Sequence, residues 1–191
     1  IIGQESTPVV AEGIEVDVPD FMTEIVATFS HLARQSSSIS QRSGVSVRLS
    51  VSNHESLVAN ATRRALHMNE HRVVPRICDL EALAASTGGK VEIESLEEGR
   101  EGQIIGQIVN AAVLTVFRDR VAPEHLLSVV EAFDGRDPVE TGEDVSAAAY
   151  VQLCQEIPAL GAAARSIAGG ESPERVASAV ELVLEGLHLS K

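Results

Sequence analysis

Tryptophan is absent from this chain of 191 residues, and aromatic residues make up only 3% of it. The apolar residues are therefore mainly Ala, Val, Leu and Ile, which pack as aliphatic helix faces rather than as stacked rings. A chain of this length can bury roughly two thirds of its unfolded surface, in one large domain or in two small ones. We expect a mostly α fold, a helical bundle with at most a short strand pair.

Cysteine is scarce, since only Cys78 and Cys154 are present, far apart and outside any Cys-x-x-Cys spacing. This pattern excludes a disulfide framework and a zinc ribbon. Lone thiols of this kind behave as small hydrophobic residues. We expect both cysteines to be buried and the protein to belong to a reducing compartment.

Long apolar runs are also missing, because no stretch approaches the roughly 20 residues that span a bilayer. The first residues, Ile1 to Glu5, lack the basic start and the apolar block of a secretory signal. We therefore expect no membrane partner and a cytoplasmic location. The chain does not begin with methionine, which favours the interpretation that it is a piece of a longer protein.

Basic charge is in deficit, with 15 Lys and Arg against 28 Asp and Glu and a net charge of -13. Such a charge repels phosphodiester backbones unless the arginines cluster. Nucleic acid is therefore excluded as the expected partner.

Apolar residues at three- and four-residue intervals predict helices along most of the chain. Residues 1–18 lack this spacing and read as an extended lead-in with room for a short strand. In the first half we expect helices from Asp20 to about residue 35, from Val47 to about Asn69, and from Ile77 to a C-cap at Gly88-Gly89, with residues 90–94 as a weak strand or a loop.

The second half begins with the most apolar predicted helix, around residues 104–117, which we expect at the centre of the first bundle. Further helices are expected at 123–133, 145–155, 158–168 and 172–189, with a Gly-, Pro- and acid-rich loop at 135–142. The predicted organisation is an extended lead-in at 1–18, a helical lid-like domain at 19–121 and a helical C-terminal extension at 122–191.

The candidate functional residue is Arg48, which follows the small-residue turn Ser43-Gly44-Val45-Ser46-Val47 at the start of a predicted helix. An arginine on the first turn of a rigid helix can meet phosphate oxygens with paired donors and stays charged. Taken by itself, the same pattern also fits a surface arginine in a weak salt bridge. The local sequence leaves both interpretations open.

Two motifs resemble the sensor-2 region of AAA+ ATPases of the magnesium chelatase subunit I and MoxR-like group. Ser46-Val47-Arg48 looks like the Ser-Pro-Arg that opens the sensor-2 helix, with Val47 where the family has proline. Ala61, Ala65 and Leu66 stand where the family has its alanine-rich face. The segment Val73-Val74-Pro75-Arg76-Ile77-Cys78-Asp79-Leu80 resembles the Val-x-Pro-x-Asp-Val break that follows, and the resemblance covers roughly residues 18–83.

This resemblance implies that Arg48 closes on ATP held by a core domain that is not in this chain. The parent protein would bind ATP and Mg²⁺ and assemble as a homo-oligomeric ring, with an unknown client protein. We expect no cofactor and no turnover in this segment alone, because it has neither a phosphate-cradling loop nor magnesium ligands. No residue of it is assigned a catalytic role.

Three alternatives stand beside this interpretation. The run His67-Met68-Asn69-Glu70-His71 fits an inverted zincin pattern with both imidazoles on one helical face. The run Gly88-Gly89-Lys90 hints at a phosphate loop, without the Ser or Thr and the earlier glycine that such a loop requires. The chain could also be an acidic helical adaptor that binds partner proteins without nucleotide chemistry. Scattered serines and His54 form no nucleophile signature.

Overall fold

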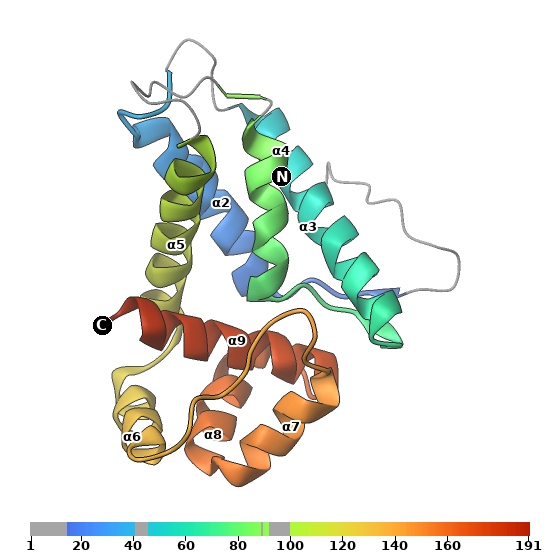
Figure 1. Cartoon of the computed structure of the whole chain (residues 1–191), viewed down its shortest axis with the longest axis vertical. Helices are drawn as coiled ribbons and strands as arrows, with labels where there is room; N and C mark the ends of the chain where they lie inside the picture. The colour runs from blue at the N-terminus through green and yellow to red at the C-terminus, as the bar shows by residue number, and fades with distance from the viewer. Residues whose placement is uncertain (1–14, 41–45, 89, 92–99) are drawn as a thin grey trace.

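The structure is a computed structural model that describes residues 15–40, 46–88, 90–91 and 100–191. The fold is mostly helical with one short parallel strand pair in these residues, as the composition predicted. Helices α2 to α5 form the upper half of the molecule and α6 to α9 the lower half (Figure 1). The helices are α2 (Asp20–Gln35), α3 (Val47–His67), α4 (Ala82–Gly88), α5 (Glu101–Arg120), α6 (Pro123–Phe133), α7 (Ala147–Glu156), α8 (Pro158–Ala168) and α9 (Pro173–Leu189).

The upper half is built on the aliphatic and phenylalanine stripe of α2. Phe21, Ile25 and Phe29 recur at four-residue steps and are each at most 2% exposed, so one face of the helix is dry. This face packs on α5, which also packs on α4 and α9. The prediction that the most apolar helix lies centrally is consistent with these three neighbours.

Helix α3 ends in a left-handed turn two residues earlier than the expected boundary. Asn69 has a φ of 54°, and the N–H of Glu70 donates to the carbonyl of Ala65 at 2.8 Å. This is the geometry of a Schellman C-cap, in which asparagine is one of the few residues that tolerate positive φ. The chain therefore turns sharply before it reaches Pro75.

The helix expected from Ile77 is wound in two parts. Its first turn is a 3-10 helix, η1 (Ile77–Glu81), and the α-helical part α4 follows. A 3-10 turn is common at a helix N-terminus. The end at Gly88 matches the expected C-cap, whereas Gly89 and most of the 90–94 segment lie outside the described residues.

Prolines and serines mark the N-termini of helices in the lower half. Pro123, Pro158 and Pro173 each occupy a first-turn position, where a missing N–H costs nothing. The hydroxyls of Ser146 and Ser172 accept hydrogen bonds from backbone N–H groups of α7 and α9, both at 3.2 Å. The two serine caps fix where α7 and α9 begin, and Pro158 marks the start of α8.

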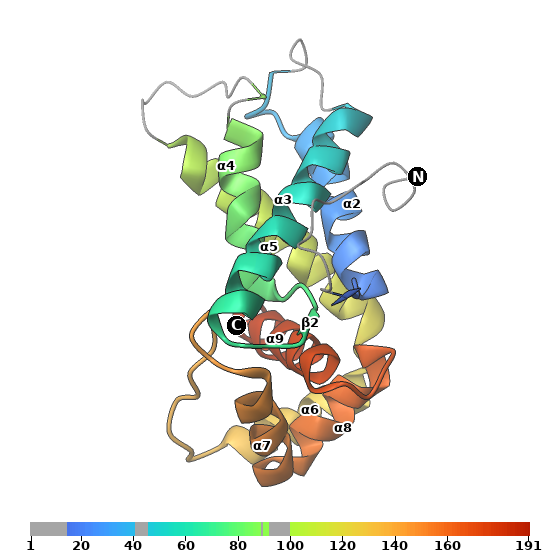
Figure 2. The ribbon, with the colours of Figure 1, turned by 90° about the vertical axis from the view of Figure 1, so that its right-hand side faces the viewer.

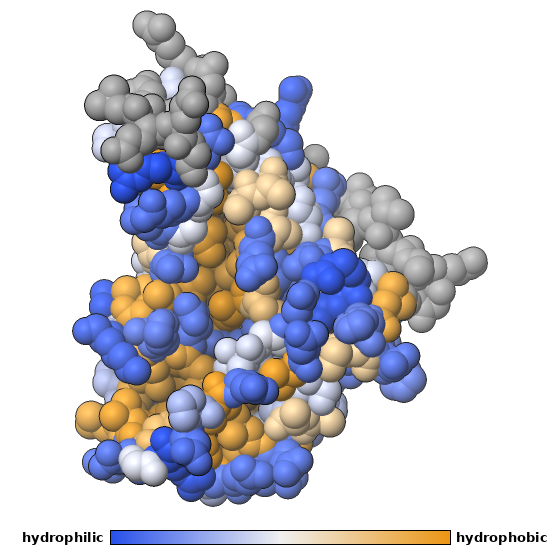
Figure 3. All heavy atoms as spheres, viewed as in Figure 1, coloured by the Kyte–Doolittle hydropathy of each residue, from blue (hydrophilic) through white to orange (hydrophobic). Residues whose placement is uncertain are grey.

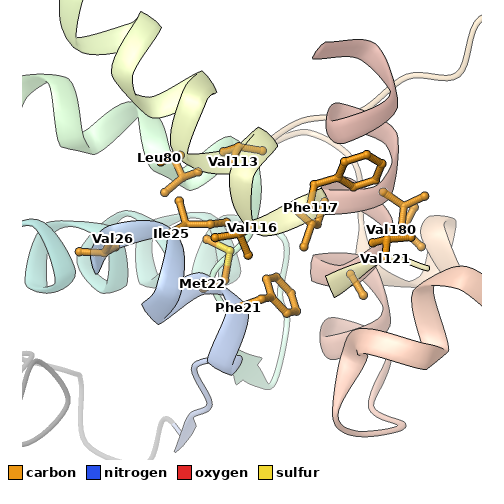
Figure 4. Close-up of a cluster of buried hydrophobic side chains, with 14 of the residues drawn as sticks. Phe21, Met22, Ile25, Val26, Leu80, Val113, Val116, Phe117, Val121 and Val180 are labelled. Atoms are coloured by element: carbon orange, nitrogen blue, oxygen red, sulfur yellow. The ribbon is translucent and has the colours of Figure 1, made fainter. Parts of the chain in front are cut away.

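One hydrophobic core runs through both halves. Figure 4 shows Phe117 and Val121 of the α5 end beside Val180 of α9, and all three side chains are at most 2% exposed. A Cβ added at Gly186 would lie 2.1 Å from Cγ of Phe117. The close approach of α5 and α9 therefore depends on glycine at 186, and the expected boundary after residue 121 is crossed by continuous packing.

The lead-in joins the fold through a parallel pair of strands, β1 (Glu15–Val16) and β2 (Arg72–Val73). Beyond β1, the N–H of Asp17 donates to the carbonyl of Val73 at 2.9 Å. The carboxylate of Asp17 accepts two hydrogen bonds from Arg175 in α9, one from Nε at 2.8 Å. The expected short strand is thus present, and residues 1–14 of the lead-in lie outside the described part.

No helix within the described ranges combines the length and apolarity needed to cross a bilayer.

Candidate functional site

Arg48 lies on the first turn of α3 with an exposed side chain. Across the described residues, its guanidinium makes no hydrogen bond or ion pair. The N-cap Ser46 provides no side-chain cap to this turn, although its carbonyl accepts a hydrogen bond from the N–H of Leu49 at 3.0 Å. The start of α3 lies at the end of the molecule opposite α7 to α9 (Figure 2).

The inverted zincin interpretation is wrong in its geometry. Helix α3 ends at His67, and His71 follows the left-handed Asn69, so the two imidazoles do not share a helical face. The Glu70 carboxylate accepts a hydrogen bond from Nη1 of Arg64 at 2.8 Å and pairs with Arg76. Over the parts of the chain that are described, no group of three or more His, Cys, Asp or Glu could hold a metal ion.

The lysine of the phosphate-loop alternative, Lys90, is hydrogen bonded to serine side chains of the same chain. The Nζ of Lys90 hydrogen bonds to Ser52 and lies 3.4 Å from Oγ of Ser86. Gly88 is the last residue of α4. His54 is buried in α3, and its burial lowers the pKa of the imidazole.

The segment that resembles the family's Val-Pro break contains a buried ion-pair network. We call Arg64, Glu70, Arg76 and Asp79 the buried arginine cluster. Arg64 donates from Nε to Oδ1 of Asp79 at 3.1 Å and from Nη2 to Oδ2 at 2.9 Å. Its Nη2 also donates to the carbonyl of Val74 at 2.8 Å. Two guanidiniums and two carboxylates balance their charges, which burial requires.

Arg76 connects the cluster to the start of α7. Its Nη1 donates to the carbonyl of Val145 at 2.8 Å, and its guanidinium lies 5.5 Å from the centroid of the Tyr150 ring. Glu70 accepts from the N–H of Ala147 at 3.0 Å. The Nε of Arg76 is the single buried side-chain nitrogen or oxygen without a partner among the described residues. The cluster thus joins the end of α3 to the lower half of the molecule.

Two side chains of α9 form hydrogen bonds with the segment from Pro75 to Cys78. The Oγ of Ser178 donates to the carbonyl of Pro75 at 2.6 Å, and Oε2 of Glu181 accepts from the N–H of Cys78 at 2.9 Å. Glu181 also accepts from the hydroxyl of Tyr150 at 2.9 Å. These hydrogen bonds fix α9 against η1, beside β2 in Figure 2.

Burial shifts the pKa values of three ionisable groups at this junction upward. Burial raises the pKa of the Glu181 carboxyl. Burial, followed by the nearby Glu181 charge, raises the pKa of the Cys78 thiol and of the Tyr150 hydroxyl. Because a thiolate is the reactive form of cysteine, Cys78 is not activated as a nucleophile. Cys154 is buried as expected, whereas Cys78 is only partly buried.

Two adjoining cavities open where the upper and lower halves meet. One is about 470 Å³ and lies between η1, α9 and the loop before α7. The other is about 380 Å³ and lies between η1, α4, α5 and α9. Ile77, Cys78 and Glu185 line both. Figure 3 shows hydrophobic side chains on the floor of the hollow between the upper helices and above α9.

Comparisons with known proteins identify no relative: no family model matches the chain, and neither a curated protein nor a solved structure matches it.

The sequence analysis did not predict the buried arginine cluster or Glu181. A signal was present, since Arg64 lies on the same helical face as Ala61 and Leu57, which are buried. Glu181 likewise follows Ala177 by four residues within the buried stripe of α9. A charged residue on an apolar face predicts a buried partner, although the pattern alone does not identify that partner.

Proposed function

We propose that this chain is the helical lid portion of an AAA+ ATPase resembling the magnesium chelatase subunit I and MoxR-like group. In this proposal Arg48 contacts the phosphates of ATP that is bound by a separate core domain. The observation that carries the proposal is the exposed guanidinium of Arg48, which has no partner among the described residues and lies on the first turn of a 21-residue helix. The sequence resemblance of this turn and of the following Val-Pro break supports it.

The positive charge at the start of α3 favours binding of an anion. A helix N-terminus carries a partial positive charge that attracts anions. Arginine adds a permanent charge with donors that match phosphate oxygens in pairs. The net charge of the whole sequence is -13, which opposes the approach of a free triphosphate. A triphosphate would therefore approach this end of the molecule only if it is already held by a core domain.

Closure of the lid on ATP would be transmitted through α3 as a rigid element. The C-terminal end of α3 is fixed by Arg64 to Asp79 and Glu70, and through Arg76 to the α7 start. Force applied at Arg48 would pass to the lower helices through these contacts. In the proposed cycle, phosphate contact closes the lid and hydrolysis releases it, which moves neighbouring subunits of a homo-oligomeric ring.

The core domain, rather than this chain, would supply the phosphate-cradling backbone and the Mg²⁺ that neutralises developing phosphate charge. The same proposal places the protein in the cytoplasm, in keeping with the two free cysteines.

The test is ATP turnover by a polypeptide in which this chain is fused to its encoded core domain. Arg48→Ala is expected to lower kcat by about tenfold or more while leaving the folded lid intact, because a lost charge-assisted contact to the transition state costs at least about 1.4 kcal/mol. Arg118→Ala is the matched control, since Arg118 is also an exposed arginine without a hydrogen bond or ion pair in the described residues.

Three results would contradict the proposal. One is ATP turnover by the purified chain alone, and another is equal kcat for Arg48→Ala and Arg118→Ala. The third is an upstream coding sequence without a Gly-x-x-x-x-Gly-Lys-Ser/Thr motif, because a lid requires such a core.

A further inference from the structure

The two adjoining cavities form a single open groove between the upper and lower halves of the molecule. We call it the η1 groove, because Ile77 and Cys78 of η1 lie at its centre and line both cavities. On one side are α4 and α5, and on the other are α9 and the loop that follows α6. Its volume, about 470 Å³ and about 380 Å³ in the two parts, falls in the range of protein binding sites.

The floor of the η1 groove is apolar and accessible. Several of its hydrophobic residues are only partly buried, which leaves carbon surface exposed to solvent. These residues are Ile77, Ala84, Val109, Phe133 and Leu184. Such a surface gains free energy when a partner's apolar atoms cover it.

Gly106 keeps the α5 side of the groove open. It lies in the interior of α5 and lines the smaller cavity. A Cβ added there would meet no atom of the surrounding structure within 4 Å, so packing does not require a glycine. Glycine inside a helix costs about 0.5–1 kcal/mol relative to alanine. Glycine at position 106 therefore makes α5 less stable than alanine would, and it keeps a side chain from entering the groove there.

Two carboxylates of the η1 groove, those of Glu185 and Glu81, have no partner among the described residues. Glu185 is half-buried between the two cavities, and Glu81 lies exposed at the edge of the smaller one. Neither carboxylate makes a side-chain hydrogen bond or an ion pair in the described part of the chain. Among the described residues, the smaller cavity has no Lys or Arg in its lining, and Lys191 is the only one that lines the larger cavity.

We propose that the η1 groove binds an apolar segment of a partner protein that carries a lysine or arginine. The apolar side chains cover Ile77 and Val109, and the cation pairs with Glu185. Charge complementarity excludes a second copy of this chain as the favoured occupant, because two chains of net charge -13 repel one another. The proposal is independent of the nucleotide proposal, since Arg48 lies at the far end of α3.

A displayed library of random peptides, selected on the whole chain, provides the probe. Enriched peptides are expected to combine Leu, Ile, Val or Phe with Lys or Arg. The best of them is then titrated into the isotopically labelled chain, and the largest chemical-shift changes are expected at Ile77, Val109 and Leu184. Binding is expected to weaken as salt is added, because the Glu185 contact is partly exposed.

Two pairs of variants identify the site. Gly106→Leu fills the groove and is expected to weaken binding at least about tenfold, the size of a hot-spot contact. Gly102→Leu is its control, because Gly102 also lies in α5 with open space around a Cβ but does not line the groove. Both variants should unfold at higher temperature than the wild type, so lost binding cannot come from unfolding.

Glu185→Gln is expected to weaken binding severalfold and to flatten its salt dependence. Glu131→Gln, an exposed glutamate of α6 outside the groove, should change neither quantity. The proposal would be overturned if no peptide is enriched, or if the enriched peptides lack basic residues. It would also be overturned by shift changes centred on the exposed Leu127 and Val130 of α6, or by equal binding of the peptide to Gly106→Leu and Gly102→Leu. Self-association that Gly106→Leu abolishes would instead assign the groove to a second copy, and it too would overturn the proposal.

Discussion

Arg64 and Asp79 form a two-point ion pair that is almost completely shielded from solvent. Nε of Arg64 lies 3.1 Å from Oδ1 of Asp79 and Nη2 lies 2.9 Å from Oδ2, with both residues 1% exposed. Asp79 also accepts from the N–H of Arg76 at 2.8 Å. One carboxylate therefore fixes the end of α3 and the start of η1 at the same time.

Asp79→Ala is expected to destabilise the chain by about 3–5 kcal/mol, because it leaves two buried guanidiniums with one carboxylate between them. Urea denaturation measures this loss. The neighbouring pair Arg63 and Glu143 is the control, since those side chains are 60% and 54% exposed. Glu143→Ala should change stability by little more than the measurement error, and similar losses in the two variants would contradict the role assigned to the buried pair.

Glu181→Gln is expected to change how stability depends on pH. Burial raises the pKa of the Glu181 carboxyl above its ordinary value of 4.5, so the folded chain keeps a proton that the unfolded chain has released. Stability from this group is present below about pH 4.5 and is lost as the pH rises through the raised pKa. Glutamine imitates the protonated carboxyl, so the variant should become progressively more stable than the wild type as the pH rises.

The measurement is the free energy of unfolding of both proteins from about pH 4 to about pH 8. Glu131→Gln on the surface of α6 serves as the control and should follow the wild-type profile. A difference between Glu181→Gln and wild type that stays constant with pH, or that shrinks as the pH rises, would be incompatible with a raised pKa.

Gly186→Ala is expected to separate α5 from α9. The new Cβ would lie 2.1 Å from Cγ of Phe117, and overpacking of this kind costs roughly 1–3 kcal/mol or more. Phe117→Leu makes room for the methyl group, so the double variant should lose less stability than the two single losses added together. Strict additivity in this double-mutant cycle would show that the ring and the glycine do not constrain one another.

Arg76→Lys is expected to loosen the start of α7 while leaving the upper helices intact. Lysine keeps a charge but cannot reach both the Val145 carbonyl and Glu70 or cover the Tyr150 ring as the planar guanidinium does. Native-state hydrogen exchange should show faster exchange at the N–H of Ala147, which donates to Glu70. Unchanged protection at Ala147 would refute the link.

Local sequence patterns predicted most of the helices correctly. The four-residue steps of Phe21, Ile25 and Phe29 predicted α2 because one helix face must be dry, whatever it packs against. Prolines and serines at 123, 158 and 172–173 predicted helix starts because their effect depends on backbone chemistry within one turn. The expectation of exposed Arg48 at a helix start is consistent with the structure, while its contact with a nucleotide stays a proposal.

The sequence by itself determined that the chain is mostly helical, acidic and almost free of aromatic residues, because these properties follow from composition and from spacing within single elements. Only the tertiary structure decided that Arg64 meets Asp79, that Glu70 is shared by two arginines rather than facing a metal, and that Glu181 lies against Cys78. These pairings join residues 6 to 103 positions apart. Which residues pair depends on how whole helices pack against one another. The periodic pattern of one helix does not indicate which charged residue of another helix will lie beside it.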